Sequence, residues 1–366
     1  MSTSECNTSV DWTTAPLPTY DELPPFRNFP GCAWGVWGPE DQLGTINLLT
    51  DALVKQSASE EIRTGKTVSL NWPLNFPAKP MFGRLPPQIK LIQKQSKEDY
   101  RDDLARDDEI HINTQSGSQW DGLRHCPVLE HEMFYNKLIR RPRSSRGIHP
   151  IEDPLQIDSS YTRIGIQNWA NHGICGRGVL LDLVKFLSKD GVLPYDPWTT
   201  HAITVPQIEA CAEAQRVQFR RGDILILRVG FIKRYYESTQ EMKDSLRGKP
   251  ETLAGVEQSE DMKRFLWLNN HFAAVASDQP ALERWPTPDG IPHLHQTILG
   301  LWGMPIGELF DLEKLSEVCA ELNRYTFFVS SWPLNIIGGA ALPPNAAVSG
   351  ISDYLNSSLT LFEAFF

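Results

Sequence analysis

The chain has 366 residues, of which 41% are hydrophobic and 22% are charged, so it is long and apolar enough to bury a sizeable core. Its formal net charge of −10 argues against a nucleic-acid binder or an anionic-membrane binder, because both need clustered Lys and Arg. The six cysteines form no C-x-x-C pair, and the sequence shows neither a signal peptide nor an apolar run of membrane length. We therefore expect a cytoplasmic protein with reduced thiols and with no nucleic-acid or membrane partner.

Elements of both secondary-structure types alternate along the chain. Residues 1–30 are rich in Pro, Thr and Ser and predict an extended N-terminal arm, whereas residues 31–366 contain no linker and predict a single domain. Two helices are indicated, at 204–215 by a capping box and at 311–323 by an apolar face. Five short apolar runs bounded by Gly, Asp or Pro predict buried strands, at 66–72, 178–183, 223–229, 272–278 and 325–331. The fold class is α/β or α+β.

Two charged segments interrupt this pattern. Residues 94–109 carry charges of both signs, and residues 137–146 carry five basic side chains. Solvated surface is the simpler interpretation of both segments. The alternative for the second is a clamp for a substrate that bears a carboxylate.

The stretch "NTQSGSQWDGLRHCP", residues 113–127, places Asp121 and His125 four residues apart among glycines that permit tight turns. A carboxylate and an imidazole held together in this way bind a metal or act as a base and its orienting partner. The alternative is an Asp that only caps a helix. Cys126 is a poor candidate nucleophile because it is adjacent to His125, and no phosphate-binding motif indicates a nucleotide cofactor.

A second stretch, "HLHQTILGLWGMPIGELFDLEKL", places His293, His295 and Glu308 in one segment. Its polar residues reach a common pocket if the apolar element between them crosses the core; otherwise His293 lies at the surface and Glu308 caps the next helix. A third candidate pair flanks the predicted strand 272–278. His271 and Asp278 either belong to the site or have structural roles. The simpler interpretation is that His271 is a structural histidine and that Asp278 ends the strand in a turn.

With these residues in view, the sequence resembles the cyclase family that includes bacterial kynurenine formamidase and isatin hydrolase. The family motif H-x-G-T-H-x-D-x-P-x-H reads Q-S-G-S-Q-W-D-G-L-R-H here, from Gln115 to His125. Five further stretches match in family order, one before the motif, "WGPEDQLGTINLLT", and four after it, "GRGVLLDL", "RGDILILRVG", "HQTILGLWGMPIGE" and "PLNIIGGAALPPNA". The chain is similar to a larger, bacterial or fungal-type member in which Gln replaces two motif histidines.

The resemblance implies a single α/β domain with a central mixed, barrel-like sheet and flanking helices, assembled as a dimer or tetramer. It also implies that His125 acts as acid and base, beside a divalent metal. Because two histidines are replaced by amides, Mn²⁺ or Mg²⁺ is favoured over Zn²⁺, and a site without metal stays open. The implied metal ligands are Gln115, Gln119, Asp121, His295 and Glu308.

Three functions remain open at this point. The first is a metal-assisted hydrolase that cleaves an amide, formamide or lactone-like bond of a small cyclic or aromatic molecule, with Trp37, Trp120 and Trp302 as an apolar pocket wall. The second is a metal-independent cyclase or isomerase, in which Asp121, His125, His295 and Glu308 perform acid–base work. The third is a small-molecule binder without activity.

Overall fold

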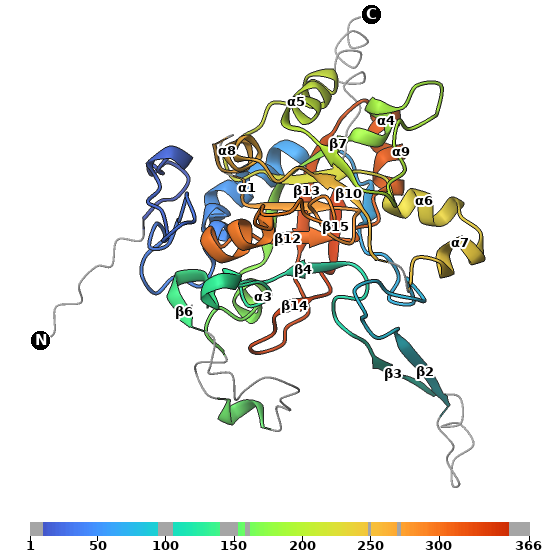
Figure 1. Ribbon diagram of the computed structural model, residues 1–366, viewed down its shortest axis with the longest axis horizontal. Coiled ribbons are helices and arrows are strands. Elements are labelled where there is room, and N and C mark those ends of the chain that lie inside the picture. Colours follow the sequence, from blue (N-terminus) through green and yellow to red (C-terminus); the bar gives the residue numbers. More distant parts are fainter. Residues whose placement is uncertain are drawn as a thin grey trace, which may run out of the picture.

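A nine-stranded mixed sheet, curled into a half-barrel, forms the centre of the molecule (Figure 1). The computed structural model describes residues 10–93, 105–139, 153–157, 162–247, 250–268 and 272–350. In spatial order the strands of the sheet are β1 (Thr67–Ser69), β15 (Ala346–Ser349), β13 (Thr326–Ser331), β7 (Ile174–Asp182), β9 (Ile224–Arg228), β11 (Ala274–Ser277), β12 (Ile306–Glu308), β4 (Gln119–Asp121) and β14 (Ala341–Leu342). The predicted single α/β domain with a mixed, barrel-like sheet is confirmed.

The middle of the sheet is parallel and its flanks are antiparallel. Strands β7, β9, β11 and β12 pair in parallel, so their carboxyl ends meet at one edge of the sheet. Strand β4 then pairs antiparallel with β12, and β13 with β7. All five predicted strands are present, as β1, β7, β9, β11 and β13. Strands β7, β9 and β11 are buried throughout, whereas β1 is short and buries only Val68.

Helices flank the sheet, and both predicted helices are confirmed. Thr204 and Gln207 form the predicted capping box at the start of one, and Asn323 closes the other in a left-handed conformation. The α-helices are α1 (Asp51–Glu61), α3 (Gln167–His172), α4 (Leu183–Leu187), α5 (Val205–Ala214), α6 (Phe231–Glu237), α7 (Gln240–Asp244), α8 (Glu260–Leu268) and α9 (Glu313–Leu322).

The central strands are buried on both faces, as parallel strands covered by helices must be. Alternate residues of β7 and β9 enter two different hydrophobic cores. Leu180 and Ile226 pack in the core that includes Leu53 of α1, whereas Leu181 packs in the core that includes Ile208 of α5. Two cores thus hold the sheet rigid from both sides.

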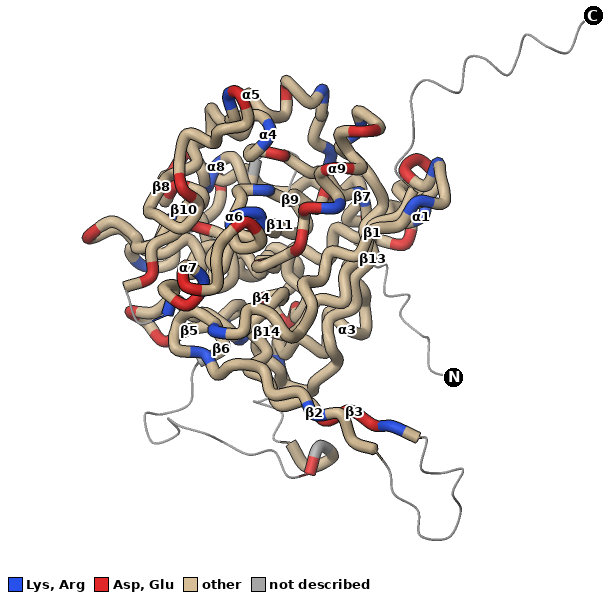
Figure 2. The backbone as a smooth tube through the Cα atoms, turned by 90° about the vertical axis from the view of Figure 1, so that its right-hand side faces the viewer, with Lys and Arg blue, Asp and Glu red and all other residues tan. Residues whose placement is uncertain are grey.

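Three smaller strand pairs lie outside this sheet. Strands β8 (His201–Ile203) and β10 (Ala254–Val256) pair in parallel, and β5 (Met133–Phe134) and β6 (Leu138–Ile139) form a short hairpin. Strands β2 (Gln88–Gln93) and β3 (Arg106–His111) form a ribbon that projects from the body (Figures 1 and 2).

The ribbon changes one prediction about the charged segments. Residues 106–109 are exposed, as expected, but they belong to β3 because they pair with β2, for instance across the weak Lys90–Glu109 ion pair. Residues 94–104 lie outside the described residues, as does 140–146 of the basic segment. The carboxylate clamp at 137–146 therefore stays a prediction.

The N-terminal segment packs on the body from Trp12 onward. The rings of Trp12 and Trp37 meet edge to face at 4.8 Å, and Tyr20 packs against Trp302. A boundary at residue 30 between an arm and the domain stays a prediction.

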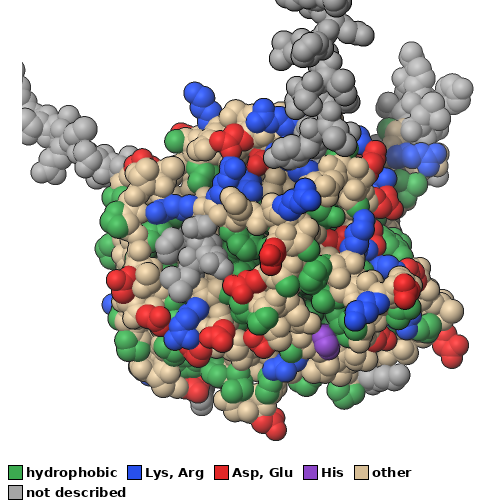
Figure 3. Space-filling view, turned by 90° about the horizontal axis from the view of Figure 1, so that it is seen from above, with side chains coloured by type: hydrophobic (Ala, Val, Ile, Leu, Met, Phe, Trp, Pro, Cys, Tyr) green, Lys and Arg blue, Asp and Glu red, His purple; other side chains and the backbone are tan. Residues whose placement is uncertain are grey.

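Acidic and basic side chains are interspersed on the face seen in Figure 3, and no single basic patch covers it. Within the described residues, no helix has both the length and the apolar character needed to cross a membrane.

Candidate metal centre and active site

Polar side chains gather where the parallel strands β11 and β12 end. Ligands of open α/β sheets bind at the carboxyl ends of the strands, so this is the edge at which a site is expected. Glu308 is the last residue of β12, and Glu283 follows β11 after a short turn. Both carboxylates are buried.

The register of β4 against β12 brings the first motif to this edge. Gln119 is paired with Glu308, and Asp121 with Ile306. Since alternate residues of a strand face opposite sides, Gln119 and Asp121 share the side that Glu308 occupies. The Gln119 Nε2 donates to Glu308 Oε2 at 2.7 Å, and both side chains are buried.

His295 lies at the centre of these carboxylates. Its Nδ1 is 2.6 Å from Glu283 Oε1, and its Nε2 is 3.1 Å from Glu308 Oε1 and 3.7 Å from Asp121 Oδ2. A buried π-helical turn, Gln296–Leu301, begins directly after it. Such turns are frequent at functional sites. We call Asp121, Glu283, His295 and Glu308 the carboxylate cluster.

The charges of the carboxylate cluster shift one another's pKa values in opposite directions. Burial lowers the pKa of His295, but its hydrogen bonds to the three carboxylates outweigh burial and raise that pKa well above its usual value. Burial raises the pKa of Glu283, but hydrogen bonds, first from His295, hold it below the usual range. Burial and the charge of Asp121 raise the pKa of Glu308. The cluster therefore carries excess negative charge that a cation stabilises.

Gln115 joins the cluster to His125. Its Nε2 lies 3.1 Å from Asp121 Oδ1 and 2.6 Å from His125 Nδ1. His125 Nε2 in turn is 3.7 Å from Asp121 Oδ2, and a quarter of the His125 side chain is exposed. The two Gln side chains that replace motif histidines thus both contact carboxylates of the cluster.

The residues of the cluster fit a divalent cation. One ligand atom each from Asp121, His295 and Glu308 lie within 4.8 Å of one another. Two buried acceptors, Asp121 Oδ2 and Gln119 Oε1, have no hydrogen-bond partner, and a cation would satisfy both. The carboxylate of Glu283 fixes the His295 ring through Nδ1, and metal-bound histidines are commonly oriented by a carboxylate on the ring nitrogen that does not bind the metal.

A cavity of about 300 Å³ opens beside the cluster. His125, His295 and Glu308 form its polar end, and Trp285 and His293 form an aromatic wall. Cys126 also lines the cavity, but burial raises the pKa of its thiol to about 11, so the thiol stays protonated near neutral pH.

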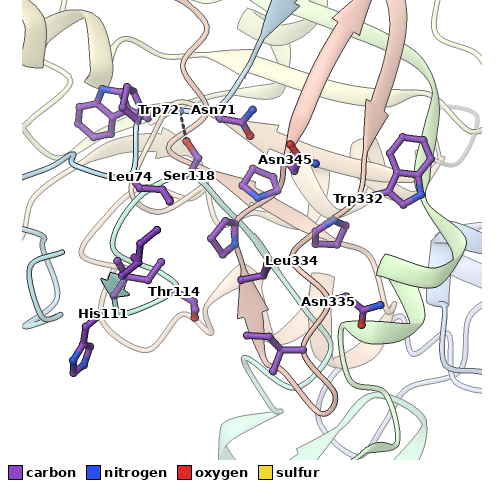
Figure 4. A pocket seen from close by; sticks show the side chains of 17 residues that line it. Asn71, Trp72, Leu74, His111, Thr114, Ser118, Trp332, Leu334, Asn335 and Asn345 are labelled. Atoms are coloured by element: carbon purple, nitrogen blue, oxygen red, sulfur yellow. Dashed lines mark hydrogen bonds between the residues drawn. The ribbon is translucent and has the colours of Figure 1, made fainter. Parts of the chain in front are cut away.

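A larger cavity lies elsewhere. It has a volume of about 960 Å³ and is lined by apolar side chains such as Trp72, Leu74, Trp332 and Leu334 (Figure 4). Ser118 lines it, but its hydroxyl donates to Leu309 O and accepts from Trp72 N, so it supplies no free polar group. The smaller cavity is the candidate site because the titratable residues face it.

The expectation that Trp37, Trp120 and Trp302 wall the pocket is wrong. None of them lines the cavity beside His125. Trp120 alternates with Gln119 and Asp121 and so points to the opposite side of β4, where its Nε1 donates to Ser331 Oγ at 2.9 Å. Trp302 donates to Gly31 O in the core, and Trp37 packs against Trp12.

Other residues of the site are not predicted by the sequence. Glu283, Arg84, Phe82 and Trp285 belong to no recognised motif, and they reach the site only through the tertiary fold. His293, a candidate, does line the cavity, where its Nδ1 is 2.6 Å from Thr287 Oγ1. His271 lies outside the described residues.

The sequence matches the model of the cyclase family, described as "Putative cyclase", over residues 41–284. The chain belongs to this family. A solved structure described as a novel cyclase is 30% identical, with a TM-score of 0.70 over 87% of this chain and 99% of that one. No curated protein matches the sequence.

The cyclase-family chain also resembles isatin hydrolases in fold. Isatin hydrolase A from Ralstonia solanacearum is 14% identical, with a TM-score of 0.51 over 77% of this chain and 91% of that one. An isatin hydrolase bound to the product analogue thioisatinate is also 14% identical, with a TM-score of 0.51 over 81% and 95% of the two chains. At this identity the likeness shows the fold alone.

Proposed function

We propose that this cyclase-family protein is a metal-dependent hydrolase that cleaves an amide, formamide or lactone-like bond of a small cyclic or aromatic molecule. The observation that carries the proposal is the buried Asp121–His295–Glu308 group, which opens with His125 onto an aromatic-walled cavity. The fold shared with the isatin hydrolases supports the same class of reaction.

Asp121, His295 and Glu308 would hold the cation, with the amide oxygens of Gln115 and Gln119 as further ligands. Such an oxygen-rich set favours Mn²⁺ or Mg²⁺ over Zn²⁺. When bound, the cation supplies a Lewis acid that polarises the scissile carbonyl and lowers the pKa of a water.

His125 is the residue that moves protons in this proposal. It takes a proton from the attacking water and returns it to the leaving nitrogen or oxygen, so the imidazole ends the cycle in its starting protonation state. To accept a proton at Nε2, the His125 imidazole must carry its own proton on Nδ1. The Gln115 amide then has to turn its oxygen toward Nδ1 to accept a hydrogen bond from it. Gln115 thus positions the base.

A second candidate is a metal-independent cyclase or isomerase. Hydrogen bonds from Gln115 to Asp121 Oδ1 and from Gln119 to Glu308 Oε2 favour it, because each gives one oxygen of a carboxylate a partner other than a cation. His125 and the carboxylate cluster would then close or rearrange a ring by acid–base steps alone.

Elemental analysis and reconstitution separate the two candidates. The purified protein is analysed for metals, stripped with a chelator and reloaded with Mn²⁺, Mg²⁺ or Zn²⁺. Each form is assayed on aryl formamides, cyclic aryl amides and aryl lactones. We expect hydrolysis that chelation abolishes and Mn²⁺ restores; turnover that persists in fully stripped protein would favour the metal-independent candidate.

A pair of variants tests the role of His125. His125→Asn should lower kcat by roughly 10²- to 10⁴-fold, the usual contribution of a general base. His172→Asn, on α3 outside the cavity, is the matched control and should keep wild-type kcat. A His125→Asn enzyme with wild-type kcat would remove His125 from the proposal.

A further inference from the structure

The cavity beside His125 carries one guanidinium, which the proposed chemistry does not use. Arg84 is the only Arg or Lys among the residues that line it. Its Nη1 donates to Gln115 O at 2.6 Å, and the guanidinium lies 5.3 Å from the centroid of the Phe82 ring. Among the residues that the structure describes, no carboxylate forms an ion pair with Arg84. The side chain is therefore held in place while its charge is not matched by a contacting anion.

An aromatic wall stands next to this charge. The rings of Trp285 and His293 stack at 5.0 Å with 14° between their planes, and Phe82 meets Trp285 edge to face at 5.4 Å. Flat ligands bind against such rings because stacked and edge-to-face contacts both favour aromatic partners. A cavity of about 300 Å³ lies at the lower end of the range for small-molecule sites, so it suits one ring or two fused rings.

The charges of the site also allow for an anion. The carboxylate cluster brings three acidic groups, which a divalent cation and the Arg84 guanidinium together neutralise. Without Arg84 the cavity would carry a net negative charge and repel an anionic ligand. Arginine also matches the planar geometry of a carboxylate with two parallel hydrogen bonds.

We propose that Arg84 is a specificity-determining residue, and that the substrate is a flat aromatic ring bearing a carboxylate or similar anion in addition to the bond that is cleaved. The ring packs against Trp285 and Phe82, and the anion lies on the guanidinium. The inference rests on the function proposed above, which places the cleaved bond beside His125 and the carboxylate cluster. It narrows the substrates of that site to aromatic anions.

A pair of probes with nearly the same shape tests the charge preference by calorimetry. Benzenesulfonate is an anion and a weak metal ligand, and methyl phenyl sulfone is its neutral counterpart. Both are titrated into stripped and metal-loaded protein, for wild type, Arg84→Gln, Arg84→Lys and the control Arg234→Gln. Arg234 lies outside the cavity, next to Trp198 and Asp196.

We expect metal-loaded wild type to prefer the sulfonate, and stripped wild type to show a smaller preference, because the carboxylate cluster is then no longer neutralised by the cation. Arg84→Gln should weaken sulfonate binding by about 10- to 100-fold, the range for a hydrogen bond to a charged group, and leave sulfone binding unchanged. Arg84→Lys should keep part of the preference, and Arg234→Gln all of it.

The outcomes separate this inference from the proposed function. A preference that survives in Arg84→Gln, or sulfonate binding too weak to detect in wild type, would overturn the role of Arg84. Those results leave the hydrolase proposal intact, because turnover and metal content are measured independently. Conversely, an Arg84-dependent preference in a protein that lacks metal-dependent turnover would support the subsite and contradict the hydrolase. If Arg84 only balanced the charge of the carboxylate cluster, Arg84→Lys would keep the whole preference for the sulfonate, because it keeps the positive charge without the planar guanidinium.

Discussion

Two buried clusters of charge lie at opposite ends of the parallel strands. At the amino ends, Arg177 of β7 bonds to Glu61 at 3.0 Å and to Asp223, just before β9, at 2.7 Å, while Arg324 also bonds to Glu61. We call these four residues the Arg177 cluster. Its two guanidinium groups match its two carboxylates, and none of its polar atoms in the described structure is both buried and without a partner. The carboxylate cluster at the opposite ends has three acidic groups around one imidazole, with unpartnered acceptors on Asp121 and Gln119.

The difference indicates which cluster is built for a ligand. A cavity of about 440 Å³ adjoins the Arg177 cluster, so volume alone would favour it over the cavity of about 300 Å³ beside His125. A matched ion-pair network has little left to offer a ligand, whereas an unmatched one needs a cation or a substrate to complete it. Both clusters are buried, but only the carboxylate cluster has an excess of negative charge and buried acceptors without hydrogen-bond partners among the described residues.

The largest expected effect comes from removing the carboxylate that belongs to the first motif. Asp121→Ala should lower kcat/KM by at least about a thousandfold, because Asp121 either holds the cation or balances His125 and His295. The melting temperature should change little, because the hydrogen bond lost at Oδ1 is offset by relief of the repulsion between Asp121 and Glu308. Turnover is measured beside thermal unfolding, with Asp51→Ala on the exposed side of α1 as control. Wild-type turnover in Asp121→Ala would take the first motif out of the site.

The second variant breaks the Arg177 cluster and should affect stability instead. Arg177→Met leaves Glu61 and Asp223 as buried charges that have lost a partner, which typically costs about 3–5 kcal/mol of unfolding free energy. Urea unfolding measures the loss. Arg220→Met, which removes a half-exposed pair with Glu60, is the matched control and should cost about 0–1 kcal/mol.

The activity of the folded Arg177→Met protein completes the comparison. At a temperature where both proteins are folded, its kcat should equal that of wild type. A loss of kcat without loss of stability would show that the Arg177 cluster, too, contributes to function.

The sequence predicts the strands and the first motif well because their signals are local. Each predicted strand is a contiguous apolar run, and the approach of Asp121 to His125 follows from their spacing in one turn. The sequence also places His295 and Glu308 in one segment, and the buried turn at Gln296–Leu301 connects them across the core.

The rest of the site depends on tertiary packing. Glu283 reaches His295 only because β11 and β12 are neighbours, and Arg84 reaches the cavity because its chain segment packs against Gln115. Trp120 shows that a residue adjacent to a site residue in the sequence need not reach the site. Next to Asp121 in a strand, it must face the opposite side, and Gly307 on β12 leaves room for its ring.

Restoring histidines tests whether the Gln side chains stand at ligand positions. Gln115→His combined with Gln119→His should raise zinc affinity by at least about tenfold, because imidazole is a better zinc donor than an amide. The two amides already lie 3.1 Å from Asp121 and 2.7 Å from Glu308, so imidazoles at these positions reach the same carboxylates. Zinc titration by calorimetry measures the gain, with Gln56→His on the exposed side of α1 as control. Unchanged affinity would mean that positions 115 and 119 do not converge on the cation.

The smallest effect concerns a buried carboxylate that resembles the site by burial alone. Asp278 follows β11, and its two oxygens accept from the backbone N–H groups of Val229 and Gly230 at 2.7 and 2.8 Å. Burial raises the pKa of Asp278 to about 7, from an ordinary value of 3.8. Between these values the folded protein holds a proton that the unfolded chain has lost, so the contribution of Asp278 to stability is full below pH 3.8 and is lost as the pH rises through 7.

Asp278→Asn should remove that slope from the unfolding free energy between pH 4 and pH 7. The variant also loses one backbone hydrogen bond, because the amide nitrogen cannot accept, and this cost of about 1 kcal/mol is the same at every pH. Urea unfolding across the pH range separates the slope from the constant offset, with Asp51→Asn as control. A slope that is the same in Asp278→Asn and wild type would assign the pH dependence to another group. A loss of kcat in Asp278→Asn beyond the unfolded fraction would instead extend the functional site from β12 to the end of β11.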